Sequence, residues 1–330
     1  MAALPVPVAP ADLQDNGAIG GAPAALREAL ELAASFAKSD RAGATLRAYA
    51  ADFDDFRAWC ASVDAEPLPA APAIIAAYLS TLTTRGLKAS TIKRRLAAIR
   101  SAHLRAGRDN PTAHELVKAA HKGIRRSIGT RVEQKAPATA KVIGSILKRV
   151  DLGSLAGVRD RALLLVGFAG ALRRSELVAL RVEDVRREPG GIIVTIGKSK
   201  TDQEGAGQEI AIPSGSKLRP VDALFAWIGA AGITSGPIFR AVDQVGRVGA
   251  EALTPQTVRL LVRKYAAAAK LNPDEFAGHS LRAGFVTSAL ESGADVFAAA
   301  DQGRWRKLET VREYDRRAKA FSKHAGKGFL

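Results

Sequence analysis

The chain has 330 residues, 47% of them hydrophobic and 25% charged, which is the composition of a globular protein with room for two domains and excludes a disordered one. Its longest apolar run, residues 162–172, is too short to span a membrane, and its first ten residues lack the basic start of a signal peptide, so we expect a cytoplasmic protein. A net charge of +16 indicates a DNA or RNA partner, or else a basic surface that serves solubility.

The N-terminal part of the chain is expected to be a mobile arm followed by helices. Residues 1–22 are rich in Ala, Pro and Gly without a period, and residues 24–38 are predicted to form a helix. An apolar stripe with spacings of three and four residues comes next, formed by Leu46, Tyr49, Phe53, Phe56 and Cys60. As the only cysteine, Cys60 excludes a disulfide, and its place in the stripe predicts a buried structural thiol.

Further helices complete an all-helical first domain, residues 23–127. One is predicted for residues 73–83, and the Ser-Thr pair at residues 90–91 is expected to cap another. The inward positions of that helix are Ile92, Leu96 and Ile99. A last helix is expected to open at the Asn-Pro pair, residues 110–111, and to run towards Arg126. Residues 128–138 lose periodicity and are predicted to be an interdomain linker.

The second domain, residues 139–330, is predicted to be mainly helical with one β-hairpin. Residues 192–196 are predicted to form a strand, and residues 208–212 are predicted to pair with it after a polar turn. Thr254 precedes a proline, so it is expected to cap a helix that runs to about residue 270.

Basic residues are concentrated in particular segments. Residues 1–84 hold 5 Lys and Arg against 10 Asp and Glu, whereas residues 85–131 hold 13 against 2, and residues 304–330 hold 9 against 3. Such blocks are typical of a nucleic-acid binder, although charge alone does not select an activity.

Several side chains that could take part in catalysis occur in the second domain, but each is ordinary when taken alone. Arg173 and Glu176 are three residues apart, so they are predicted to share a helical face, as a surface ion pair would. A second pair with this spacing, His279 and Arg282, follows a glycine turn. Also candidates are Trp305, Tyr314 and two lysines at the hairpin turn, Lys198 and Lys200.

Their order and spacing resemble the tyrosine recombinase (phage integrase) family. That order is Arg-x-x-Glu, a hairpin lysine, His-x-x-Arg, Trp, and Tyr nine residues later. The amino-acid sequences of residues 158–185 and 90–100 are similar to the family as well. The resemblance covers residues 25–326. Most members have a second histidine where this chain has Trp305, and tryptophan there, with residues 196–201 of the hairpin, looks most like the Cre recombinase subgroup.

The resemblance implies a mainly α architecture in which a helical core-binding domain and a mixed α/β catalytic domain form a C-shaped clamp around DNA. It implies that Tyr314 is the nucleophile, with His279 as the base or donor beside it. Lys200 is the expected acid for the departing 5′ hydroxyl, and Lys198 is its rival.

The remaining catalytic positions suit stabilisation of a phosphodiester as charge develops on it. Arg173 and Arg282 have planar guanidinium groups that can each form two hydrogen bonds to the non-bridging oxygens. The indole of Trp305 can donate a hydrogen bond but cannot transfer a proton. Glu176 matches the acidic position of the family that orients the neighbouring cations.

The reaction implied by the resemblance gives a 3′-phosphotyrosyl linkage and a free 5′ hydroxyl, and it exchanges one phosphodiester for another. It therefore requires no ATP, metal or other cofactor, and no acidic cluster has metal-ligand spacing. The implied partner is double-stranded DNA with specific recombination sites. Monomers in solution are expected to assemble as a homotetramer on two such sites. Binding to DNA would make the protein nucleoid-associated. Candidate DNA contacts are Lys93, Arg94, Arg95, Arg100, Lys118 and Lys122.

Two alternatives stay open at this point. A type IB topoisomerase or a telomere resolvase would use the same kind of tyrosine and cationic pocket, and a DNA-binding protein without activity would share the basic surface. The target sequence, the need for accessory proteins, and the choice between integration, excision and dimer resolution do not follow from these residues.

Overall fold

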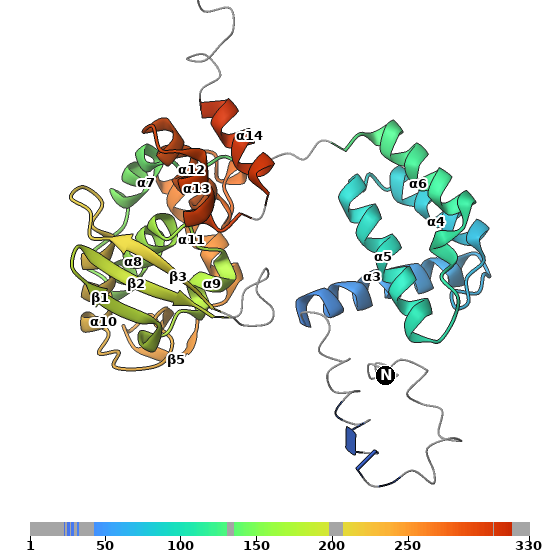
Figure 1. Cartoon of the computed structure of the whole chain (residues 1–330), viewed down its shortest axis with the longest axis horizontal. Coiled ribbons are helices and arrows are strands. Elements are labelled where there is room, and N and C mark those ends of the chain that lie inside the picture. Colours follow the sequence, from blue (N-terminus) through green and yellow to red (C-terminus); the bar gives the residue numbers. More distant parts are fainter. Residues whose placement is uncertain are drawn as a thin grey trace, which may run out of the picture. The chain divides into compact units, whose positions relative to one another are not determined.

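The computed structural model describes residues 43–130, 135–197, 207–305 and 307–318, together with part of residues 23–32. The predicted arm, most of the predicted helix at residues 24–38 and the turn with Lys198 and Lys200 lie outside the described residues. The chain divides into two compact units, residues 1–133 and 134–330 (Figure 1). This division falls within the predicted linker, while the other domain boundaries stay predictions.

The first unit is helical, as predicted. Its helices are α3 (Gly43–Ser62), α4 (Pro72–Thr84), α5 (Ala89–Arg105), a 3-10 turn η2 (Pro111–Ala113) and α6 (Glu115–Ile128). Their core contains Phe56, Cys60, Ile75, Tyr78, Leu79, Leu82, Ile92, Ile99 and Val117. The burial of Cys60 and Ile92 confirms the stripes read from the sequence, because a 3.6-residue period turns those positions to the same side.

Two predicted helix starts in this unit are wrong. Helix α5 begins at Ala89, and the N–H groups of Thr91 and Ile92 donate to the carbonyl of Lys88, so the Ser-Thr pair lies inside the first turn instead of capping it. Asn110 caps only η2. Helix α6 has its own cap, His114, whose extended backbone interrupts the helix and whose ring accepts from the N–H of Leu116.

The second unit combines helices with two small antiparallel sheets (Figure 1). The three-stranded sheet has the order β1 (Val185–Glu188), β2 (Gly191–Ile196), β3 (Gln208–Pro213), and the two-stranded sheet pairs β4 (Arg240–Val242) with β5 (Val248–Ala252). The helices are α7 (Ala140–Leu147), α8 (Leu155–Ala169), α9 (Arg174–Ala179), α10 (Pro220–Ala230), α11 (Pro255–Ala268), α12 (Ser280–Glu291), α13 (Val296–Gly303) and α14 (Leu308–Ala318).

Helix α8 lies at the centre of this unit, in contact with α10, α12 and β3. The predicted hairpin is confirmed, since Ile192 of β2 pairs with Ile212 of β3, and both side chains are buried. The side chain of Thr254 caps α11 as predicted, at 3.2 Å from the N–H of Thr257. Strand β1 and the β4–β5 pair were not predicted; their short, mostly exposed sequences lack the alternation that marks a half-buried strand. Among the described residues, no helix is long and apolar enough to cross a membrane.

Candidate active site

The turn between α8 and α9 positions the first arginine of the predicted set. Ala171 has a left-handed backbone (φ 45°), which is costly for a residue with a Cβ atom. After this turn, Arg173 occupies the N-cap position of α9 with extended angles of φ −71° and ψ 151°, so the prediction that Arg173 shares a helical face with Glu176 is wrong. The two residues nevertheless meet, because the backbone N–H of Arg173 donates to Oε2 of Glu176 at 2.8 Å, which is the half of a capping box that the carboxylate supplies.

Glu176 is a buried carboxylate held between two guanidinium groups. Its Oε1 pairs with the side chain of Arg173, and its Oε2 lies 2.5 Å from Nη2 of Arg304. Burial by itself would raise the pKa of Glu176, but the charge of Arg304 and then the hydrogen bonds and charge of Arg173 bring the pKa below its usual value. The carboxylate is therefore ionised at neutral pH and orients both arginines.

Arg282 comes from α12 and is almost completely buried, with 2% of its surface exposed. Its Nη1 donates to the carbonyl of Ala171 at 3.0 Å, and its Nη2 donates to the carbonyl of Arg304 at 3.4 Å. Burial, followed by the charges of Arg173 and Arg304, lowers the pKa of Arg282 to about 9. Among the described residues, the hydrogen bonds of this buried cation go to carbonyl oxygens, which leaves its charge available to an anion such as phosphate.

His279 lies at the N-cap position of α12, directly after Gly278. A Cβ atom on Gly278 would lie 1.8 Å from Cδ of Arg174, so glycine is needed for this side chain to pass. His279 is exposed to solvent. Loss of hydration in these surroundings, followed by the charges of Arg282, Arg173 and Arg174, lowers the pKa of His279. The imidazole is therefore neutral at neutral pH and can accept a proton.

Trp305 contacts both Arg282 and the predicted nucleophile. Cζ of Arg282 lies 4.1 Å from the centroid of the Trp305 ring, and the ring of Tyr314 approaches edge-on at a centroid distance of 6.2 Å. Tyr314 is partly buried on α14, in a cluster that includes Val286 of α12 and Ala300 of α13. The fold thus brings Tyr314 next to Trp305 and Arg282. It also brings Arg173 near Arg282, although these two arginines are more than one hundred residues apart in the sequence.

The two candidate lysines, Lys198 and Lys200, lie outside the described residues. Their hairpin leaves β2 at Ile196 and returns at Gln208, the first residue of β3. Gln208 lines a polar pocket of about 380 Å³ that Arg304 and Trp305 also line. Within the described ranges, no group of three or more His, Cys, Asp and Glu could hold a metal ion.

Comparison with known families matches both units. Residues 138–320 match the phage integrase family, and residues 36–108 match the N-terminal SAM-like domain of phage integrases. The chain belongs to the phage integrase family. It is a tyrosine recombinase, as the order of its catalytic motifs predicted.

Two relatives that match over most of their length support the assignment. An integrase/recombinase XerD homologue of Selenomonas ruminantium is 39% identical over 293 residues, which cover 87% of this chain and 86% of the relative. The Cre recombinase of Escherichia phage P1 is 26% identical over 280 residues, covering 78% and 80% of the two chains.

Solved structures show the same fold at lower identity. A lambda integrase dimer bound to a COC′ core site superposes with a TM-score of 0.57 at 17% identity, covering 92% of this chain and 84% of that one. The XerH site-specific recombinase in its post-cleavage complex with difH superposes with a TM-score of 0.55 at 17% identity, covering 78% and 72%. The prediction of a mainly α fold with small sheets is confirmed.

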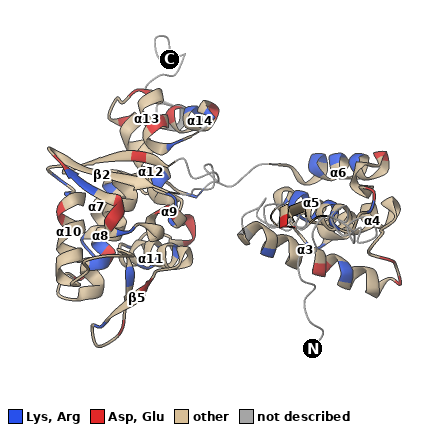
Figure 2. Ribbon diagram, turned by 60° about the horizontal axis from the view of Figure 1, so that its bottom comes forward, with Lys and Arg blue, Asp and Glu red and all other residues tan. Residues whose placement is uncertain are grey.

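The predicted DNA contacts of the first unit fall into two groups. Lys93, Arg100 and Lys122 are exposed. Figure 2 shows Lys and Arg positions in blue along the ribbons of α5 and α6. Lys118 is also exposed and pairs with Glu115 at 2.8 Å.

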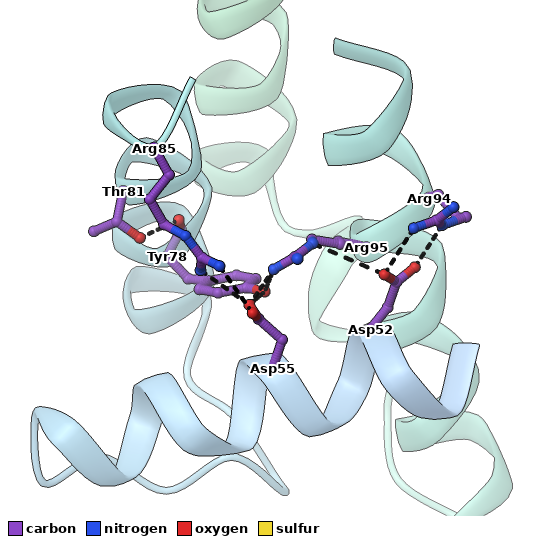
Figure 3. Close-up of polar contacts among 7 residues, drawn as sticks. All are labelled: Asp52, Asp55, Tyr78, Thr81, Arg85, Arg94 and Arg95. Carbon is purple, nitrogen blue, oxygen red and sulfur yellow. Dashed lines mark hydrogen bonds and ion pairs between the residues drawn. The ribbon is translucent and has the colours of Figure 1, made fainter. Parts of the chain in front are cut away.

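Arg94 and Arg95 instead turn towards carboxylates of α3 (Figure 3). Arg94 forms two hydrogen bonds with Asp52, at 2.7 and 3.0 Å. Arg95 is 13% exposed and contacts both Asp55 and the hydroxyl of Tyr78. These contacts tie the two helices together, so they favour a structural role for Arg95 in particular.

Sequence reasoning missed Arg304, whose buried guanidinium pairs with Glu176. The one signal in the sequence is its position directly before Trp305, because the family motif stated above has no cation at that place. Arg304 also has a left-handed backbone, with φ 52° and ψ 48°, at the C-cap of α13. Such a conformation cannot be foreseen for an arginine, because left-handed positions usually hold glycine or asparagine.

Proposed function

We propose that this recombinase cleaves and rejoins DNA at specific sites through a covalent bond between Tyr314 and a 3′ phosphate. The observation that carries the proposal is that the guanidinium of Arg282 lies over the ring of Trp305, which also contacts the ring of Tyr314. Arg173 and His279 are close enough to Arg282 for their charges and pKa values to be coupled to it. Buried cations with few local acceptors are suited to a phosphate under attack, which gains negative charge as the transition state forms.

In the proposed reaction, the oxygen of Tyr314 attacks phosphorus, and the bond between phosphorus and the 5′ oxygen breaks. His279 accepts the phenolic proton, for which its neutral imidazole is suited. Lys200 gives a proton to the departing 5′ oxygen, with Lys198 as its rival. The 5′ hydroxyl of a partner strand then attacks the phosphotyrosine in the reverse sense, so the bond energy is conserved and no ATP or metal is required.

The electrostatic roles follow from the contacts in the site. Arg173 and Arg282 grip the non-bridging oxygens of the phosphate, and Trp305 donates its indole N–H while it stacks on the guanidinium of Arg282. Glu176 orients Arg173 through two hydrogen bonds and does not touch the phosphate itself.

We also propose that both units bind duplex DNA, with exposed Lys93, Arg100, Lys118 and Lys122 reaching phosphates. Of the other two candidates, Arg94 remains half-exposed beside Asp52 and can still reach a phosphate, whereas Arg95 is better suited to holding α5 against α3. DNA binding would also make the protein nucleoid-associated.

Assembly on DNA is proposed to need the C-terminal tail. Its sequence places Phe321, Phe329 and Leu330 among basic residues, and an apolar groove of about 540 Å³ lies between β2–β3 and α12–α13, with Phe285 and Ile193 among its lining residues. We propose that the tail of one protomer occupies this groove of the next in a homotetramer on two DNA sites. Deletion of residues 318–330 should abolish synapsis of two sites and spare single-site binding; normal recombination after the deletion would contradict this.

Recombination can be separated from simple relaxation of DNA. Cleavage sites are first mapped by sequencing the DNA that remains covalently bound to the protein, and two copies are then placed in a supercoiled plasmid. We expect deletion or inversion of the segment between them. Relaxed plasmids without exchange would instead identify a topoisomerase, and the absence of any covalent complex would identify a binding protein.

A further inference from the structure

Arg304 carries two costs that a surface residue would avoid. Its backbone is left-handed, with φ 52° and ψ 48°, which L-residues other than asparagine and aspartate rarely adopt. Its side chain is charged, yet only 5% of it is exposed. A position that combines an unfavourable backbone with a buried charge indicates a specific interaction that compensates for both.

Among the described residues, Arg304 contacts two predicted catalytic residues, Glu176 through its side chain and Arg282 through its carbonyl. Its Nη2 lies 2.5 Å from Oε2 of Glu176 and 3.5 Å from the carbonyl of Ala171, the same carbonyl that anchors Arg282. The carbonyl of Arg304 accepts a hydrogen bond from Nη2 of Arg282. Side chain and backbone of one residue thus fix two different members of the site.

Without Arg304, the carboxylate of Glu176 would cancel the charge of Arg173. Glu176 pairs with Arg173, and one carboxylate beside one guanidinium leaves little net charge at the front of the site, where 19% of the Arg173 side chain is exposed. Arg304 approaches the same carboxylate from the buried side. Its Nε and Nη1 are buried and have no hydrogen-bond partner among the described residues, so its charge is only partly neutralised by Glu176.

We propose that Arg304 is a positioning residue for DNA cleavage, which neutralises Glu176 from behind and holds the backbone acceptor of Arg282. The carboxylate can then orient Arg173 without cancelling its charge at the phosphate. The inference rests on the proposed function, because it assigns Arg304 a part in the same reaction.

The test compares Arg304→Met, Arg304→Lys and Arg304→Gly in the full chain with a nicked suicide duplex that carries the mapped cleavage site. Methionine retains much of the side-chain volume without charge, lysine restores the charge without the planar fork, and glycine relieves the left-handed backbone. Lys270→Gly is the matched control, since Lys270 is also left-handed (φ 60°) but is exposed at the end of α11.

We expect Arg304→Met and Arg304→Gly to lower the single-turnover cleavage rate about 10- to 100-fold, the range found when a group that orients catalytic ligands is removed. Affinity for intact duplex, measured in the Tyr314→Phe background, should change less than about threefold, which corresponds to less than one hydrogen bond of binding energy. Arg304→Lys should recover part of the rate, free guanidinium should partly rescue Arg304→Gly, and Lys270→Gly should cleave at the normal rate.

Normal cleavage by Arg304→Gly would overturn the proposal, and so would equal losses of rate and of affinity without rescue by guanidinium. Circular dichroism and thermal unfolding show whether Arg304→Met is folded; if it is not, the decision rests on Arg304→Gly and Arg304→Lys. A failure of the unsubstituted chain to form any covalent adduct would refute the proposed function, which distinguishes that failure from a failure of the role of Arg304.

Discussion

A single methyl group added at Gly303 should displace Trp305 and so impair cleavage. Gly303 is the last residue of α13, and a Cβ atom there would lie 1.5 Å from Cζ3 and 2.0 Å from Cε3 of Trp305. Carbon atoms need about 3.5 Å, so in Gly303→Ala the ring must retreat by about 2 Å. That movement breaks its stacking on Arg282, now at 4.1 Å, and its edge contact with Tyr314.

The expected magnitudes follow from these contacts. Overpacking costs about 1–3 kcal/mol, against which alanine gains up to about 1 kcal/mol of helix propensity, so the free energy of unfolding should fall by about 1 kcal/mol. For cleavage, a displaced phosphate donor costs about 2.7–4 kcal/mol of transition-state stabilisation, which is about a 100- to 1,000-fold loss of rate; partial repositioning would leave a loss of at least about tenfold.

The assay is single-turnover formation of the covalent adduct on a nicked suicide duplex, together with thermal unfolding. Gly144→Ala is the matched control, because in the described part of the chain an added methyl at Gly144 of α7 meets no atom within 4 Å. The control should cleave normally and gain about 0.5–1 kcal/mol of stability. If Gly303→Ala cleaves as fast as the control and is equally stable, Trp305 does not have the place assigned to it.

Three further predictions concern charge. Asp55→Asn should lower the local stability of α3–α5 by about 2 kcal/mol, measured by hydrogen exchange because the two units need not unfold together. The pKa of Asp55 is lowered, chiefly by its hydrogen bonds with Arg85. The stabilisation by this carboxylate is therefore present above the usual aspartate pKa of about 4 and is lost as the pH falls below that value. A difference in local stability between Asp55→Asn and the unsubstituted chain that persists unchanged into strong acid would contradict this. Because the pKa of His279 is also lowered, the cleavage rate should stay level from pH 8 to about 6.5 and fall only at lower pH, and a decline that begins well above pH 6.5 would argue against a neutral imidazole. Lys93→Gln with Arg100→Gln should reduce the slope of log affinity against log salt by about 2, and an unchanged slope would place the DNA elsewhere.

Much of the fold could be predicted because its signals are local. The apolar stripe ending at Cys60, the cap at Thr254 and the alternating residues of the β2–β3 hairpin each depend on a few neighbouring residues. Strand β1 was missed for the same reason, since its Val-Arg-Arg-Glu sequence has one partly buried side chain and three exposed ones. It is a strand only because β2 offers it a partner.

The candidate site was predicted as a set of residues but not as a geometry. The order of motifs named Arg173 and Tyr314, yet the left-handed turn at Ala171 that moves Arg173 out of the helix has no local signature. Pairing across the fold was equally hidden. A count of charges shows that residues 85–131 are basic, but it cannot show that Arg95 is held by Asp55, forty residues earlier. The same limit concealed Arg304, which meets Glu176 across 128 positions of sequence.

The proposed reaction depends above all on a covalent bond between Tyr314 and DNA. The most direct measurement is mass spectrometry of the covalent complex after digestion of its protein and DNA, with the ends of the cleaved strand identified in the same sample. We expect a nucleotide remnant joined through its 3′ phosphate to the peptide that contains Tyr314, a free 5′ hydroxyl on the other fragment, and no adduct from Tyr314→Phe. A remnant on another residue, or a linkage to the 5′ phosphate, would contradict the account.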